Sequence, residues 1–192
     1  MKIFKKLNLT LGCLFLLLLI GCSNNTKDIS SLPIEYISAS QIIDRDNLNE
    51  LIGDADNVFV ARIDKIENTT YERDKYPFTN YSITVMENIK GNLKKNVEIP
   101  MTKNGGVNKN GKSIKLYKGD ILPEVNKYYI VSTYTQPDGS LLISGPNSSV
   151  LCNESSIIGI KKSEQYKKYL DAFKNEIKRK GDRQRFNSKY VE

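Results

Sequence analysis

Short stretches in the middle of the chain alternate between apolar and polar residues, which predicts β-strands. The strands are expected at residues 57–66, 81–86, 97–101, 128–135 and 141–144. The first (NVFVARIDKI) begins as a continuous apolar run and then alternates, as expected of a strand that leaves the core for an edge. The last two form the clearest hairpin, joined by a turn at residues 137–140 (PDGS). Four or five strands without intervening helices predict an antiparallel sheet that curls or closes.

Helical periodicity flanks this β region on both sides. Apolar residues between 40 and 52 predict one or two short helical turns that stop at Gly53. A second helix is expected between an N-cap at Ser163 and a stop at Gly181. Its apolar residues recur every three or four positions: Tyr166, Leu170, Phe173 and Ile177. This stripe predicts an amphipathic helix that packs on the sheet, and a helix that lies on a membrane or binds a partner is the alternative. The predicted fold class is mainly β (α+β).

The first 21 residues have the three regions of an export signal. Lysines at positions 2, 5 and 6 precede an apolar stretch at 7–20, and the small Gly21 comes before Cys22. The apolar stretch is short for a transmembrane helix, which needs about 20 apolar residues. Leu19, Ile20, Gly21 and Cys22 resemble the lipobox of bacterial lipoproteins. That resemblance implies cleavage before Cys22 and a diacylglyceryl group on its thiol; an ordinary secretory signal with a chance cysteine is the alternative.

The remaining cysteines and the missing histidines restrict the chemistry of the mature chain. Cys13 lies in the signal, so Cys152 has no partner for an internal disulfide once Cys22 is lipidated. Cys152 alternates with Val150 as in a strand, which predicts a buried thiol. The chain contains no histidine, which excludes Ser-His-Asp and Cys-His catalysis and His-ligated metals. Carboxylate-only chemistry remains possible, but no acidic pair is marked out by its surroundings.

Charged residues concentrate in two places. The densest acidic group lacks the glycine and glutamate of a calcium loop, so we expect helix capping and solvation, with no metal or cofactor: Asp44, Asp46, Asp54 and Asp56. The net charge is +7 for the full chain and +4 without the three signal lysines. A basic cluster near the C-terminus comprises Lys178, Arg179, Lys180, Arg183, Arg185 and Lys189. It is interpreted as a solvated helix end; contact with anionic lipid or wall polymer is the alternative, and nucleic acid is not expected of an exported protein.

The order of several short motifs supplies a resemblance over residues 54–150. The motifs are DADNVFVARI at 54–63, TNYSITV at 79–85, IKG at 89–91, NGG at 104–106 and KYYIV at 127–131. They resemble a group of exported proteins of Gram-positive bacteria, and also the netrin and metalloproteinase-inhibitor modules. The resemblance implies a small, five-stranded OB-type β-barrel. Ala61 stands where the pattern usually has glycine. The chain also lacks the inhibitor modules' combination of disulfides and a cysteine with a free amino terminus, so metalloprotease inhibition is not expected.

These patterns predict four segments and one binding loop. The segments are a signal peptide at 1–21, a flexible tether at 22–36, an OB-like domain at 37–160, and a C-terminal helix with a basic tail at 161–192. Asn104, Gly105 and Gly106 either turn the chain at positive φ or begin a ligand-binding loop on the barrel rim. The aromatic residues expected to face a ligand are Tyr81, Tyr117, Tyr128 and Tyr134.

Two functions remain open at this point. The first is a non-catalytic binding module, anchored to the membrane through Cys22, whose partner is a cell-wall polymer or another envelope protein. The second is a carboxylate-dependent cell-wall or polysaccharide hydrolase, which would need two carboxyl groups facing each other across a cleft.

Overall fold

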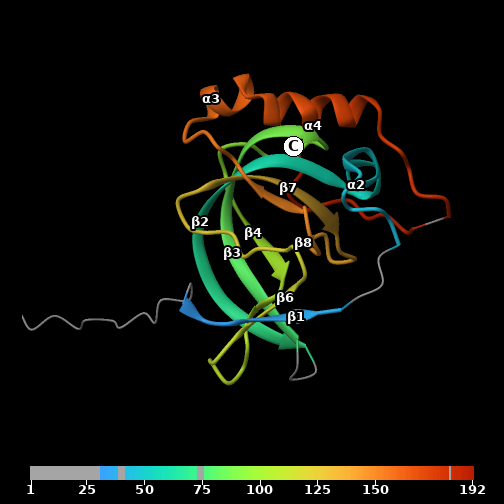
Figure 1. The fold of residues 1–192 in the computed structure, drawn as a ribbon. Coiled ribbons are helices and arrows are strands. Elements are labelled where there is room, and N and C mark those ends of the chain that lie inside the picture. The colour runs from blue at the N-terminus through green and yellow to red at the C-terminus, as the bar shows by residue number, and fades with distance from the viewer. Residues whose placement is uncertain (1–30, 39–41, 73–75, 182) are drawn as a thin grey trace, which may run out of the picture. The chain divides into compact units, whose positions relative to one another are not determined.

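The computed structural model describes residues 31–38, 42–72, 76–181 and 183–192 (Figure 1). The chain divides into two units, Met1–Ser31 and Leu32–Glu192, and every element below belongs to the second. The predicted signal at 1–21, with Leu19, Ile20 and Gly21, lies outside the described residues, as do Cys22 and the tether up to residue 30. Within the described ranges, no helix is long and apolar enough to cross a bilayer.

The described residues confirm the mainly β fold class, with nine strands in two sheets and three helices. The strands are β1 (Ile34–Ile37), β2 (Asn57–Glu72), β3 (Tyr76–Lys90), β4 (Glu98–Asn104), β5 (Gly106–Val107), β6 (Ile114–Tyr117), β7 (Tyr128–Thr135), β8 (Leu141–Ile143) and β9 (Ser149–Leu151). The helices are α2 (Leu48–Asp54), α3 (Ile157–Lys162) and α4 (Glu164–Lys174). One sheet has the order β2-β3-β4-β8-β7-β9, and β2 also pairs with β7; the other has the order β1-β6-β5.

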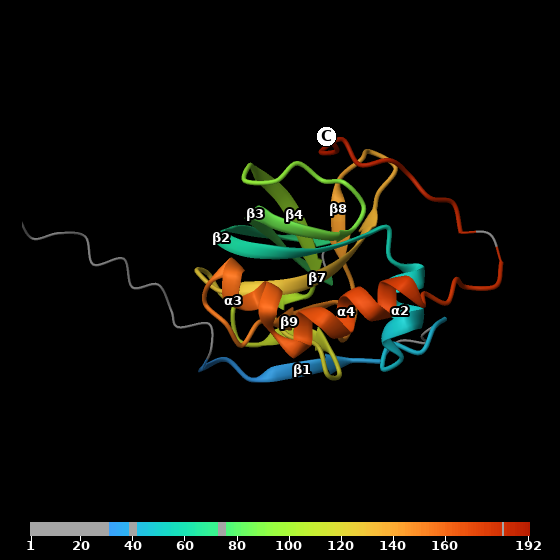
Figure 2. The same cartoon turned by 90° about the horizontal axis from the view of Figure 1, so that it is seen from above.

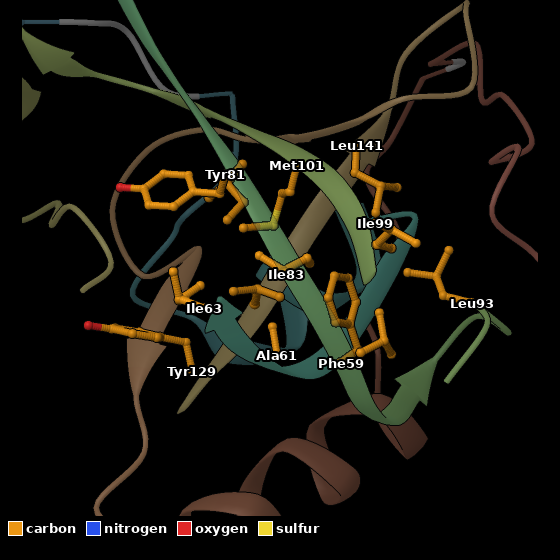
Figure 3. Close-up of a cluster of buried hydrophobic side chains, with 13 residues drawn as sticks. Phe59, Ala61, Ile63, Tyr81, Ile83, Leu93, Ile99, Met101, Tyr129 and Leu141 are labelled. Atoms are coloured by element: carbon orange, nitrogen blue, oxygen red, sulfur yellow. The ribbon is translucent and has the colours of Figure 1, made fainter. Parts of the chain in front are cut away.

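The start of β2 is apolar on both sides because each side faces a different part of the core. Phe59, Ala61 and Ile63 belong to a buried cluster whose side chains, from β2, β3, β4, β7 and β8, point toward one another (Figure 3). Val58 and Val60 face the opposite way, into a second cluster covered by α2, α3 and α4. The continuous apolar run at 58–61 therefore marks a strand buried on both faces. Figures 1 and 2 both place α2 beside one end of α4.

Two strand pairings depart from the predicted antiparallel sheet. β4 runs parallel to β8, with Lys103 opposite Ile143. β1 runs parallel to β6, so residues 34–36, assigned to the tether, are part of a sheet. Local patterns could not indicate either pairing, because parallel neighbours are joined by long connections and not by a tight turn.

The helix boundaries also differ from those expected. α2 begins after the N-cap Asn47, and Gly53 lies inside it instead of ending it. Ser163 caps α4 as predicted, and it also ends the unpredicted helix α3. α4 stops at Lys174, well before Gly181, because the chain turns there toward α2. The backbone N–H of Ile177 then donates to the carbonyl of Asn49 at 3.0 Å.

The described residues of the C-terminal segment, 175–181 and 183–192, are an integral part of the fold and not a solvated helix end. Val191 forms a β-bridge with Leu93, and the N–H of Lys94 donates to the carbonyl of Tyr190 at 2.8 Å. Tyr190 and Val191 pack against the first core cluster. The predicted solvated basic tail is therefore wrong for the part of it that carries Arg183 and Arg185, whose contacts are described below.

Cys152 is buried and free, as its alternation with Val150 predicts. Burial raises the pKa of its thiol to about 11, so the thiolate is scarce at neutral pH. This agrees with a structural role for the residue and not with a nucleophilic one.

Candidate functional site

An open pocket of about 360 Å³ lies where α2, β6, β7 and β8 meet the C-terminal segment. Its charged lining residues are Arg45, Asp54, Arg179 and Arg183. Tyr117 and Tyr134 supply aromatic surface, and Ile42, Leu142 and Pro146 are among the apolar residues. The pocket therefore combines cationic, aromatic and apolar groups in one cavity, which is the usual make-up of a small-molecule site.

Tyr134, on β7, is the polar centre of this pocket. Its hydroxyl donates to Oδ2 of Asp54 at 2.8 Å and accepts from Nη2 of Arg45 at 3.1 Å. The guanidinium carbon of Arg183 lies 4.9 Å from the centroid of the Tyr134 ring, and that of Arg45 lies 6.0 Å from it. Burial raises the pKa of Tyr134, although the neighbouring Arg45 opposes the shift. The phenol is thus held neutral and fixed in orientation between two cations.

Among the described residues, Asp54 is the only acid that lines the pocket. It closes α2, and 4% of its surface is exposed. Its Oδ1 atom makes no hydrogen bond within the described part of the chain. Nε of Arg183 and Nε of Arg179 lie 3.8 and 3.9 Å from Oδ1, which is longer than a charge-assisted hydrogen bond. The carboxylate therefore balances the arginines electrostatically without occupying their donors.

Two arginines of the C-terminal segment bind the end of α2. Arg183 Nη2 lies 2.5 Å from Oδ1 of Asp56 and donates to the carbonyl of Asp54 at 2.9 Å. Arg185 Nη1 lies 2.7 Å from the same Asp56 oxygen, and its Nη2 donates to the carbonyl of Gly53 at 2.9 Å. These contacts satisfy carbonyls that a helix C-terminus leaves without partners, and they put positive charge at the negative end of its dipole.

Arg45 reaches the pocket from the segment before α2. Its Nη1 donates to Oγ of Ser148 at 2.8 Å, and its own carbonyl accepts from Asn147 Nδ2 at 3.1 Å. Gly145 has φ +85°, and a Cβ built there would lie 3.0 Å from Arg45 Cζ. A glycine at this position gives the guanidinium room beside the backbone.

The structure separates the tyrosines chosen from the sequence. Tyr117 and Tyr134 line the pocket. Tyr81 is fully buried in the first core cluster, where burial raises its pKa, so it cannot face a ligand in this pocket. Tyr128 packs against the second cluster, beneath the helices.

Gly105 and Gly106 have positive φ where β4 ends and β5 begins, as the turn interpretation of this stretch expects. The Nδ2 atom of Asn104 donates to the hydroxyl of Tyr117, a lining residue of the pocket, at 3.2 Å. Gly105 forms a bridge with Phe78, and Gly106 begins β5. Both glycines are buried with positive φ, and a Cβ on Gly106 would lie 2.4 Å from Thr79 Oγ1. They serve close approach between strands, so neither extends into a rim loop.

The sequence analysis did not identify Asp54 and the lining arginines as members of one site; these arginines are Arg45, Arg179 and Arg183. A signal was present, because an acidic group at 44–56 and a basic cluster at 178–189 are complementary in charge. About 130 residues separate them, however, and only the folded chain brings them together. Within the described ranges, no group of three or more Asp, Glu, Cys or His side chains is placed to hold a metal ion.

A buried ion pair lies outside the pocket. Lys103 Nζ, at the end of β4, lies 2.5 Å from Oδ2 of Asp120, and the two side chains are 0% and 1% exposed. Burial lowers the pKa of Lys103 and raises that of Asp120, against the attraction between them.

No protein-family model matches the chain, and no curated protein matches it.

Proposed function

We propose that the protein is a membrane-anchored extracytoplasmic lipoprotein, attached through Cys22, whose folded unit is a non-catalytic binding module of the OB-like barrel type. The strand order β2-β3-β4-β8-β7, with β7 paired to β2 and β4 parallel to β8, supports the barrel. The export signal and the lipobox at 19–22 support the anchor. The partner we propose is a component of the cell envelope.

The pocket around Tyr134 is the observation that carries the binding role. It presents a fixed phenol, guanidinium donors and apolar surface in one open cavity. The carboxylate-dependent hydrolase is the less favoured alternative, since it needs two facing carboxyl groups and the described part of the lining contains one acid, Asp54. Asp56 and Glu176, at a neighbouring pocket, already pair with Arg185 and Lys90 at 2.7 Å.

An NMR titration tests the binding role. Soluble fragments of the cell envelope are added to isotope-labelled protein, and backbone amide shifts are followed. We expect saturable shifts at Gln136, Leu142 and Gly145, which line the pocket, and none at exposed residues of α4 such as Lys168. Shifts confined to the helices, or cleavage of the fragments during the titration, would contradict the proposal.

Replacing Cys22 with serine tests the anchor. The variant cannot form the thioether, so we expect loss of incorporated labelled fatty acid and release of the protein from the membrane fraction after a carbonate wash. Two or more acyl chains give firm attachment, whereas none leaves the chain free. Cys152→Ser is the control, because its buried thiol is not accessible to an acyl donor and labelling should stay unchanged. A Cys22→Ser protein that had lost its leader and still remained with membranes after the wash would overturn this part of the proposal.

A further inference from the structure

The pocket around Tyr134 carries an excess of positive charge. In the described lining, Arg45, Arg179 and Arg183 stand against a single carboxylate, that of Asp54. The adjoining pair of Asp56 and Arg185 adds one charge of each sign and leaves the balance unchanged. The described groups around the cavity therefore leave two positive charges uncompensated.

The guanidinium donors at this site are incompletely used. Nε of Arg183 is buried and makes no hydrogen bond to another described residue. The contact found for Arg179 in the described part of the chain is the 3.9 Å approach to Asp54, although its side chain is only 21% exposed. Arg183 does make a close ion pair with Asp56, at 2.5 Å, but through Nη2, so this pair leaves its Nε unused. An oxyanion in the pocket could therefore accept hydrogen bonds without breaking a close ion pair.

The other wall of the pocket suits a compact, weakly polar body. Ile42, which is 78% exposed, Leu142, Pro146 and the Tyr117 ring contribute apolar surface to the cavity. A ligand that carried only charge would leave this apolar surface in contact with water. A ligand with an anionic group attached to a small apolar or ring-shaped body would use both walls.

We propose that this pocket binds the phosphate monoester group of a small organic molecule, with Arg179 and Arg183 as its principal donors. The inference rests on the binding role proposed above and specifies its ligand class. A phosphate monoester carries a charge of about −1.5 to −2 at neutral pH, which matches the excess, whereas a carboxylate neutralises only half of it. The planar guanidinium fork also matches the geometry of phosphate oxygens.

Calorimetric titration of the full chain at pH 7.5 and 0.15 M salt tests this assignment. The test ligands are phenyl phosphate, benzoate and benzyl alcohol, which share a ring and differ in charge. We expect phenyl phosphate to bind at least tenfold more tightly than benzoate, and benzyl alcohol more weakly still. Vesicles containing phosphatidic acid form a separate arm: binding there with no response to phenyl phosphate would assign the phosphate to a lipid headgroup.

Two matched variants locate the binding. Arg179→Gln removes a pocket charge from a side chain with few contacts, and we expect a tenfold or greater loss of affinity for phenyl phosphate. Lys180→Gln removes the same charge one residue away, on an exposed side chain outside the lining, and we expect less than a twofold change. Amide spectra of both variants should overlay on the wild type outside the pocket, which separates lost binding from lost structure.

Three outcomes would overturn the inference. Benzoate could bind as tightly as phenyl phosphate, the two variants could lose affinity equally, or neither phenyl phosphate nor the phosphatidic acid vesicles could bind. If envelope fragments still shift the pocket amides in any of these cases, the proposed binding role stands and only the ligand class is wrong. If the fragments also leave those amides unchanged, the binding role itself fails.

Discussion

Replacing Lys103 with methionine is expected to lower the free energy of unfolding by about 3–5 kcal/mol, because it leaves the buried carboxylate of Asp120 without its cation. Asp120 has one further described partner, the N–H of Ile121, which donates to Oδ1 at 2.9 Å. The burial that raises the pKa of Asp120 favours its neutral form, so protonation recovers part of the loss. Urea unfolding followed by circular dichroism measures the change.

Two comparisons make this result specific to the buried pair. Lys65→Met breaks the exposed pair with Glu67, whose side chains are 67% and 40% exposed, and should leave the free energy of unfolding nearly unchanged, because solvent screens an exposed pair. The double replacement Lys103→Met with Asp120→Leu removes both charges and should recover most of the lost stability. If the single and double variants were equally unstable, packing volume and not charge would explain the loss.

Replacing Gly53 with alanine should destabilise the fold by about 1–3 kcal/mol, the usual cost of forcing an atom into a filled space. A Cβ at this position would lie 2.1 Å from the carbonyl oxygen of Ile177, which is a backbone atom and cannot rotate away. Alanine favours a helix over glycine by about 1 kcal/mol, so intrinsic propensity alone predicts the opposite sign. Thermal and urea unfolding give the sign of the stability change, which distinguishes the steric effect from helix propensity.

The same variant should loosen the C-terminal segment. Ile177 donates to Asn49, and the arginines beyond it bind the end of α2, so displacing Ile177 weakens these contacts together. We expect faster tryptic cleavage after Lys178 and Arg179 than in the wild type. Gly159→Ala, in α3, is the control, because its nearest neighbours are the side chains of Glu154 and Ser156, which can shift. A stable, protease-resistant Gly53→Ala protein would show that the segment does not press on α2.

The elements that depend on local interactions were predictable. The hairpin of β7 and β8 was located to within one residue, because alternation and a Pro-Asp-Gly turn are both local signals. Ser163 was identified as a helix cap because its hydroxyl needs only the N–H of Tyr166, three residues on. The end of α4 was misplaced, because Ile177 continues the apolar period although its backbone leaves the helix for α2.

The candidate site was predictable only in fragments. Tyr117 and Tyr134 were chosen, together with Tyr81 and Tyr128, as aromatic residues that could face a ligand, and both line the pocket. Tyr81 has the same local pattern, yet it lies in the core, since which face of a strand is buried depends on what packs on each side. The role of Gly106 depended likewise on a distant atom, Thr79 Oγ1.

The amino-acid sequence by itself determined the mainly β class, the turn positions, the helix cap, the buried lone thiol and the absence of histidine chemistry, since each follows from residue type and short-range spacing. The tertiary structure alone decided the parallel pairings, the docking of the C-terminal segment and the meeting of Arg45, Arg179 and Arg183 around Tyr134. The reason is physical: hydrophobic periodicity specifies which face of an element is buried, but it carries no information on which distant element covers that face.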